Sequence, residues 1–155
     1  MPKTMPEPET FELAYRNTHY WVYETASPAN PSGDRWLLRV DQHQPLLLRA
    51  YMRHGVHCAS YLTACNPHGR LLDAAENSKR MLALREALRQ EGWQWAEGFG
   101  QDPHGQWPGE DSVLVWGMDR PVALAWGAQW QQKAVLFCGA DAVPELLWPH
   151  RKLLN

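Results

Sequence analysis

The chain has 155 residues, of which 45% are hydrophobic and 21% are charged, and its formal net charge is −2 with a pI of about 6.4. The balanced charge argues against a nucleic-acid-binding surface, and no apolar run approaches the ~20 residues that a membrane span needs. Length and composition together predict one domain with a buried core.

The N-terminal segment, residues 1–9, is polar and proline-rich, which predicts a disordered tail before a single globular domain at 10–155. The tail has no apolar stretch of the kind found in a signal peptide. The chain contains three cysteines, an odd number, which favours free thiols in a reducing compartment. We therefore expect a cytoplasmic protein.

The first predicted elements are a short helix from Thr10 and a β-hairpin. Residues 19–26, HYWVYETA, are rich in aromatic and β-branched side chains, which is typical of a strand. A loop of Pro, Gly, Ser and Asn follows at 27–34, and RWLLRV at 35–40 predicts the second strand of the hairpin.

A second helix is expected at 45–54. Pro45 suits the first turn, the apolar side chains recur at helical spacing, and Gly55 stands where a C-terminal cap belongs.

The most informative stretch is a buried strand at 57–64 that leads into a long helix at 74–90. Asn66-Pro67 ends the strand, and Asp73 with Glu76 has the spacing of a capping box. Asn77 falls on the apolar stripe of this helix, so its amide needs hydrogen-bond partners. The nearest candidates are backbone groups of the Asn66-Pro67 loop.

The second half of the chain alternates further strands with one helix and ends in a tail with a single helical turn. The predicted strands are 93–100, 112–118 and 133–138, the helix follows the cap Asp119 and ends near Gln131, and the helical turn covers Pro144 to Trp148.

The order of these elements predicts an α+β protein with a mixed β-sheet. From 57–64 onward the order is β-α-β-β-α-β, the ferredoxin-like split arrangement, and the preceding β-hairpin and helix would add to one edge of the sheet and cover its second face. The strands at 57–64, 112–118 and 133–138 are apolar on both sides, which also predicts a sheet covered on both faces.

A loop at 101–111, QDPHGQWPGED, carries two turn patterns. Asp102 to Gly105 suits a type I turn, and Trp107 to Glu110 suits a type II turn with Gly109 at its third position.

The predicted topology brings polar side chains together at one edge of the sheet. In a right-handed crossover the strands at 57–64 and 93–100 point the same way, so their C-terminal ends lie at one edge, where the long helix also begins. We expect a ligand-binding site at this edge. Its candidate residues are Thr63, Asn66, Asn77, Gln101, Asp102, Trp107, Glu110 and Gln132.

Structural roles are the alternative for these residues, because Asn and Asp recur in turns and caps for backbone reasons. Asn66 and Asn77 fit both interpretations. Glu110 is the candidate catalytic residue, since a carboxylate beside an indole such as Trp107 can have a raised pKa.

A metal site is not predicted. Cys58 and Cys65 lie at opposite ends of one extended strand and cannot share a zinc ion, and the histidines nearby match no zinc spacing. No Walker A, G-x-S-x-G or H-E-x-x-H pattern is present, and Gly98-Phe99-Gly100 lacks the rest of a dinucleotide fingerprint. The sequence therefore predicts no cofactor.

Three functions remain open. The first is a binding module for a small polar ligand or a partner's peptide, in which Trp107 offers a stacking face. The second is a small enzyme with Glu110 as general acid or base. The third is a protein–protein interaction or assembly factor that uses exposed tryptophans, of which the chain has nine in all.

Several motifs together resemble one protein family. They are AYRNTHYWV, YLTACNP, AEN before a Leu-rich helix, GFGQDPHGQWPGEDSVLVWG and WQQKAVLF, spread over about residues 13–140. They resemble the bacterial family named domain of unknown function 3293. Members of that family usually have an aromatic residue at the position of Cys65 and a glycine at that of Gln131. The family has no assigned activity, so the resemblance implies a small bacterial cytoplasmic domain and no substrate.

Overall fold

The computed structural model describes residues 8–26, 28 and 31–150, with the side chains of residues 8–10 left out. Within these residues the chain forms four α-helices, one 3₁₀ turn and seven strands. In chain order they are α1 (Pro8–Asn17), β1 (His19–Glu24), β2 (Asp34–Leu38), α2 (Pro45–His54), β3 (Ala59–Leu62), η1 (Pro67–Gly69), α3 (Ala74–Gln90), β4 (Trp95–Gln101), β5 (Glu110–Trp116), α4 (Arg120–Gln129), β6 (Val135–Cys138) and β7 (Pro144–Leu147).

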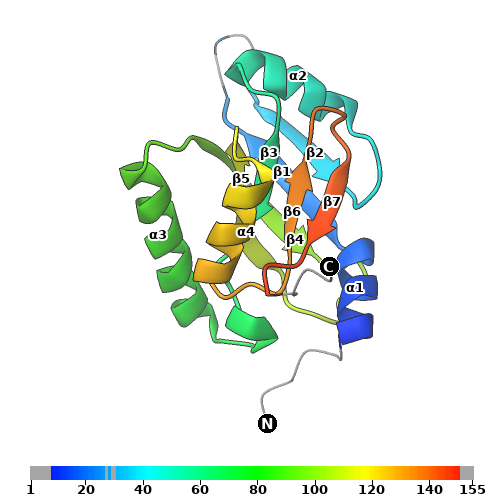
Figure 1. Cartoon of the computed structure of the whole chain (residues 1–155), viewed down its shortest axis with the longest axis vertical. Coiled ribbons are helices and arrows are strands. Elements are labelled where there is room, and N and C mark those ends of the chain that lie inside the picture. The colour runs from blue at the N-terminus through cyan, green and yellow to red at the C-terminus, as the bar shows by residue number, and fades with distance from the viewer. Residues whose placement is uncertain (1–7, 27, 29–30, 151–155) are drawn as a thin grey trace.

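The strands, labelled in Figure 1, form one sheet. Their order in the sheet is β2-β1-β4-β5-β3-β6-β7. Every neighbouring pair is antiparallel, so the expected α+β class is confirmed, whereas the expected mixed sheet is wrong. The two strands joined by α3, β3 and β4, do run in the same direction, but β5 lies between them. Hence the crossover through α3 creates no parallel neighbours.

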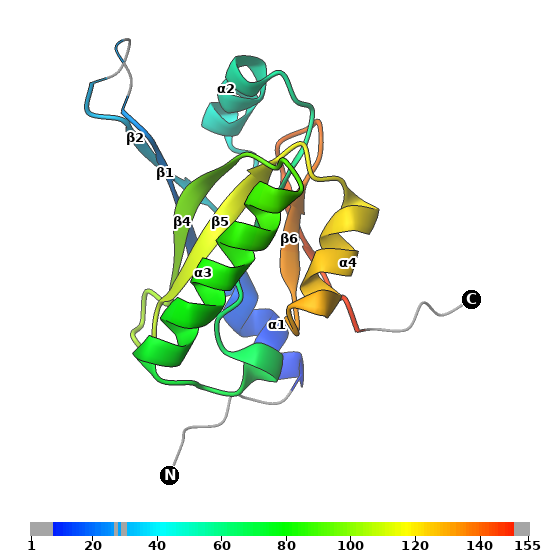
Figure 2. The same cartoon turned by 90° about the vertical axis from the view of Figure 1, so that its left-hand side faces the viewer.

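Helices cover both faces of the sheet. In Figure 2 α3 and α4 lie side by side across one face, and α1 and α2 lie behind the other. Each face has its own apolar cluster. One packs Leu47 and Tyr51 of α2 against the sheet, and the other packs Leu84 of α3 and Trp126 of α4 against it. Coverage of both faces explains why the central strands lack the apolar–polar alternation of a half-exposed sheet.

Local signals in the sequence place the helices well. The predicted bounds of α2 and α3 are confirmed, with Gly55 in the left-handed conformation after α2. Asp73 and Asp119 cap α3 and α4 by accepting hydrogen bonds from the backbone N–H groups of Glu76 and Val122. The predicted strands are also present, with ends that differ by one or two residues.

Near the C-terminus, the helical turn predicted at Pro144 to Trp148 is wrong, because Pro144–Leu147 is the edge strand β7. The sequence Pro-Glu-Leu-Leu favours the start of a helix, but pairing with β6 supplies hydrogen bonds that an isolated helical turn lacks. Tertiary pairing therefore overrides local propensity here.

At the N-terminus, helix α1 begins at Pro8, two residues before the predicted start. The rest of the predicted tail, residues 1–7, lies outside the described residues. None of the helices in the described part of the chain is long and apolar enough to cross a membrane.

Two glycines near the site are required by close packing. A Cβ on Gly98 would lie 2.6 Å from the Tyr61 hydroxyl oxygen and 2.8 Å from the Trp21 carbonyl oxygen, and one on Gly109 would lie 2.0 Å from the Phe99 ring. Gly109 does not have a positive φ, so the type II turn predicted at Trp107 to Glu110 is wrong. The glycine there makes room for an aromatic ring.

We expect Gly98→Ala to lower the free energy of unfolding by about 1–3 kcal/mol, because the added methyl group overpacks a rigid backbone and Tyr61. Gly100→Ala, two residues along the same strand, is the matched control, since its nearest neighbour would be 3.9 Å away. Urea unfolding of both variants measures the difference. Equal stability of the two variants would contradict the packing role of Gly98.

Candidate functional site

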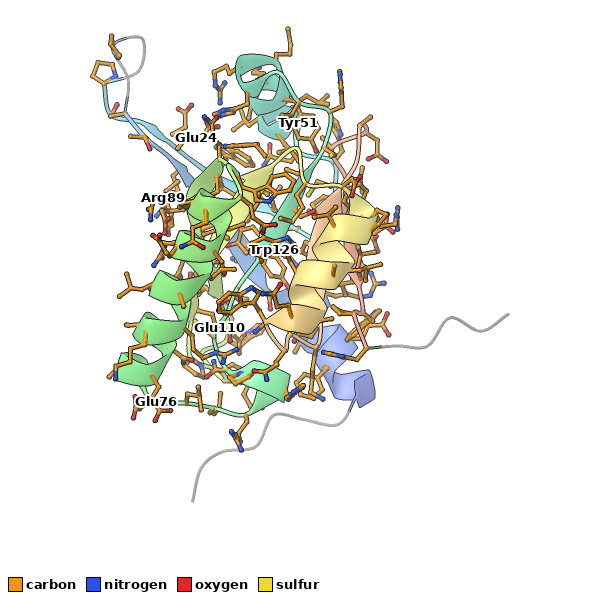
Figure 3. All side chains as sticks on the ribbon, turned by 60° about the vertical axis from the view of Figure 1, so that its left-hand side comes forward. Glu24, Tyr51, Glu76, Arg89, Glu110 and Trp126 are labelled. Carbon is orange, nitrogen blue, oxygen red and sulfur yellow. The ribbon has the colours of Figure 1, made fainter. Side chains whose placement is uncertain are left out.

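The candidate site lies at the end of the sheet where β3 stops, β5 begins and α3 begins. Figure 3 labels Glu110 at this end, near Glu76 in the first turn of α3, whereas Tyr51 of α2 lies at the opposite end. Hydrogen bonds of Thr63 fix the segment that directly follows β3. The Thr63 hydroxyl donates to the Asp111 carbonyl oxygen over 2.6 Å and accepts a hydrogen bond from the Cys65 N–H over 3.1 Å.

Asn66 is the centre of a hydrogen-bond network. Its φ of 50° is left-handed, a conformation that Asn adopts more readily than most residues. Its backbone N–H donates to Oδ1 of Asn77 over 2.9 Å, and its own Oδ1 accepts from the Asn77 Nδ2 and from the Leu72 backbone N–H, both over 2.9 Å. The expectation that Asn77 bonds to backbone of the Asn66-Pro67 loop is thus confirmed.

This network determines which way the Asn66 amide points. A backbone N–H can only donate, so the atom that faces Leu72 must be the amide oxygen. The amide nitrogen then points toward β5, where it donates to Oε2 of Glu110 over 2.8 Å. Asn66 therefore orients the Glu110 carboxyl group.

Glu110 is a partly buried acid at the first residue of β5. Burial raises the pKa of its carboxyl group to about 7, although the hydrogen bond from Asn66 acts to lower it. Among the residues that the structure describes, no Lys, Arg or His forms an ion pair with it. Hence the acid can hold or lose a proton near neutral pH.

Glu110 and Trp107 line a cavity of about 80 Å³. Three tyrosines form much of its aromatic wall: Tyr15 from α1, Tyr20 from β1 and Tyr61 from β3. Burial raises the pKa of all three phenols, so they stay neutral at physiological pH. The remaining lining is Ala14, Thr18, Thr63, Asn66, Gly69, Leu71, Gly100, Asp102, Pro108, Ser112, Gln132, Lys133, Ala134, Val135, Leu136 and Leu146.

The candidate residues do not all reach this cavity. Asn77 lies behind Asn66 and is absent from the lining, and Gln101 is exposed, where it accepts a hydrogen bond from the Trp21 indole over 3.3 Å. Asp102 contributes to the lining, but its carboxylate accepts three backbone N–H groups of its own loop. Although burial acts in the opposite direction, these bonds lower the pKa of Asp102.

Gln132 lines the cavity from the segment before β6. It is buried, and its Nε2 donates to the carbonyl oxygens of Cys65 and Trp130 over 3.1 and 3.2 Å. The residue before it, Gln131, has a φ of 61°, which is the conformation that a glycine adopts without strain. This explains why a glycine is suited to that position.

Sequence reasoning missed the residues that α1 and β1 contribute. Tyr15 belongs to the helix predicted from Thr10, but nothing near it in the sequence shows that this residue lines a cavity together with Glu110 at the start of β5. Lys133 was missed as well; its ammonium group lies 4.6 Å from the centre of the Phe11 ring. Tertiary packing alone brings these side chains to Glu110.

Two other chemical centres were weighed. Burial raises the pKa of Cys65 to about 11, so this thiol near Glu110 stays protonated and is a poor nucleophile. In the described ranges no group of three His, Cys, Asp or Glu side chains is arranged to hold a metal ion.

Comparison with known proteins adds a family resemblance. Residues 62–135, slightly less than half of the chain, match the family described as protein of unknown function (DUF3293). No curated protein and no solved structure matches the sequence. The matched segment contains Asn66, Asn77, Trp107, Glu110 and Gln132, so the resemblance inferred from the motifs is confirmed over the part of the chain that supplies the network around Glu110.

Proposed function

We propose that the protein is a binding module for a small polar ligand, which occupies the cavity beside Glu110. The observation that carries the proposal is a partly buried carboxyl group that lines a cavity and is oriented from behind by Asn66. Apolar and aromatic walls with a few positioned polar groups are typical of ligand sites. A cavity of about 80 Å³ suits a small molecule, or one side chain of a peptide, better than a macromolecular surface.

In this proposal the two asparagines have different roles. Asn77 supports the loop and does not touch the ligand, whereas Asn66 both closes the loop and presents Glu110. The strand order β4-β5-β3-β6, with α3 and α4 on one face, supports a ferredoxin-like split arrangement as the scaffold of the site.

General acid–base catalysis is the second candidate. It is favoured by one observation, the pKa of about 7 at Glu110, because an acid near half-protonation at neutral pH is suited to move protons in both directions. Among the described residues near it, the Cys65 thiol is protonated, the lining tyrosines are neutral and the Asp102 carboxylate is bound by three backbone N–H groups, so none of them is an activated nucleophile. Binding is therefore the simpler function.

The assembly hypothesis loses the observation on which it depended. All nine tryptophans lie within the described residues, and each is at least partly buried. Six large apolar side chains are exposed in the described residues, and three of them lie on α2: Leu13, Tyr23, Leu46, Leu48, Met52 and Leu82. None of the six is a tryptophan, and single exposed apolar side chains are normal for a protein surface.

A thermal-shift and tryptophan-fluorescence screen of metabolites and nucleotides tests the binding function. We expect at least one compound to stabilise the protein and to change its fluorescence, with the fluorescence change reduced in Trp107→Phe. Trp93→Phe is the control, because Trp93 packs in the core cluster on the α3 side and does not line the cavity. Failure of every compound, or an equal loss in both variants, would contradict binding beside Glu110.

The raised pKa of Glu110 predicts an unusual dependence of stability on pH. Between pH 4.5 and 7 the folded protein keeps a proton that the unfolded chain releases, so the free energy of unfolding falls as pH rises. Glu110→Gln removes this effect and keeps an acceptor for Asn66. It should raise stability by about 1–3 kcal/mol at pH 8 and change little at pH 4.

The matched control for that comparison is Asp111→Asn, which removes one negative charge from an exposed neighbour on the same strand. Urea unfolding at both pH values measures the two differences. Two results would contradict the raised pKa of Glu110. One is an Asp111→Asn effect as large as that of Glu110→Gln. The other is a Glu110→Gln variant that is less stable than the wild type at pH 8.

The supporting role of Asn77 has its own test. Asn77→Leu should lower the free energy of unfolding by about 1–3 kcal/mol, because the buried Asn66 N–H loses its acceptor. Asn77→Asp keeps an acceptor at Oδ1 and should recover part of the loss. Unchanged stability of the leucine variant in urea unfolding would instead mean that Asn77 is not needed for the fold.

A further inference from the structure

Three of the hydroxyl groups that line the cavity donate their protons to backbone carbonyl oxygens. The Tyr20 hydroxyl donates to the Tyr15 carbonyl oxygen over 3.1 Å, and the Tyr61 hydroxyl donates to the Trp21 carbonyl oxygen over 2.9 Å. The Thr18 hydroxyl donates to the Ala14 carbonyl oxygen over 2.6 Å. A hydroxyl has one proton but two lone pairs, so these groups can offer a ligand only acceptor oxygens.

Glu110 adds the strongest acceptor. Its Oε2 is bound by Asn66, but within the described residues no hydrogen bond reaches its Oε1 and no cation pairs with it. An ionised carboxylate in a partly buried place without a counter-charge is unfavourable. A cation that enters the cavity would supply the missing counter-charge.

The walls of the cavity are also suited to a cation. Tyr15, Tyr20, Tyr61 and Trp107 all line it, and the rings of Tyr20 and Tyr61 meet edge to face with centroids 5.3 Å apart. The faces of aromatic rings carry partial negative charge and attract ammonium groups, the more so when water is excluded.

The other polar groups that line the cavity do not compete for this role. The ammonium group of Lys133 lies over the Phe11 ring, and the carboxylate of Asp102 is bound by three backbone N–H groups. The lining donors that remain within the described part of the chain include the Tyr15 hydroxyl, which has no hydrogen bond there, the ammonium group of Lys133 and the second N–H of the Asn66 amide. The balance of groups that can face a ligand near Glu110 therefore favours acceptors.

We propose that the ligand of this cavity is a small organic cation, an amine whose ammonium group donates hydrogen bonds to Glu110 while its carbon skeleton contacts the aromatic wall. This assignment rests on the proposed binding function and specifies the ligand class of the same site. Neutral alcohols and carboxylates of the same shape bind more weakly, because they leave Glu110 without a counter-charge or place a second negative charge beside it.

The pKa of Glu110 gives the proposal a signature in the wild-type protein. An ammonium ion favours the ionised carboxylate, so binding releases the proton that Glu110 holds below its pKa of about 7. The ionised fraction rises from about a tenth at pH 6 to about nine tenths at pH 8. Affinity for the amine should therefore rise about tenfold over this range.

Two shape-matched series of probes test the assignment by calorimetry and thermal shift on the full chain: benzylamine, benzyl alcohol and benzoate, and butylamine, butanol and butyrate. We expect an amine to bind best in at least one series and to bind about tenfold or more weakly to Glu110→Gln. Asp111→Asn is the matched control and should keep the affinity of the wild type. The pH series on the wild type needs no variant, so it decides the matter even if Glu110→Gln folds poorly.

The outcomes separate this inference from the proposed function. Preferential binding of benzoate or butyrate, with a fluorescence change that Trp107→Phe removes, would overturn the amine assignment while the cavity remains a ligand site. An affinity for the amine that is independent of pH and of Glu110 would also overturn it. If none of the six probes binds, the amine assignment fails, and the wider metabolite screen decides separately whether the cavity binds a ligand.

Discussion

The hydrogen bonds of the Asn66 side chain hold the site together, because they join three segments that are distant in the sequence. Through them the end of β3, the start of α3 and the start of β5 share one amide. The residue at position 66 must meet two demands. Its backbone must adopt the left-handed conformation, and its side chain must both accept and donate hydrogen bonds. Glycine would meet only the first demand. Aspartate would place a second carboxylate against Glu110, so asparagine is the residue that satisfies both.

The fold does not stabilise the ionised form of Glu110. Its carboxyl group is partly buried, receives one neutral hydrogen bond and has no cationic partner among the described residues. A protein selected only for stability would carry glutamine or an apolar residue here. Side chains that lower stability in this way are expected where a protein binds or transforms something. The same reasoning underlies both candidate functions, which differ in whether the proton on Glu110 moves during a reaction or on ligand binding.

Small residues shape the cavity as much as large ones. Gly98 leaves space for the Tyr61 ring to reach the Trp21 carbonyl oxygen, and Gly109 leaves space for Phe99 beneath the loop that carries Trp107. The aromatic side chains can therefore pack at the end of the sheet without filling the cavity beside Glu110. Close packing thus explains Gly98, the first glycine of the Gly98-Phe99-Gly100 segment that lacks the context of a nucleotide-binding loop.

The sequence by itself determined the helices at 45–54 and 74–90, their caps, and the edge at which Asn66, Asn77, Glu110 and Gln132 come together. Helix caps and apolar periodicity depend on residues within one or two turns of each other, so they can be recognised in the sequence without a structure. Only the tertiary structure decided the antiparallel order of the strands, the edge strand β7, and the placing of Tyr15, Tyr20 and Tyr61 around Glu110. These features depend on hydrogen bonds and packing between segments far apart in the chain, and no local pattern of side chains encodes which distant partner a helix or strand will meet.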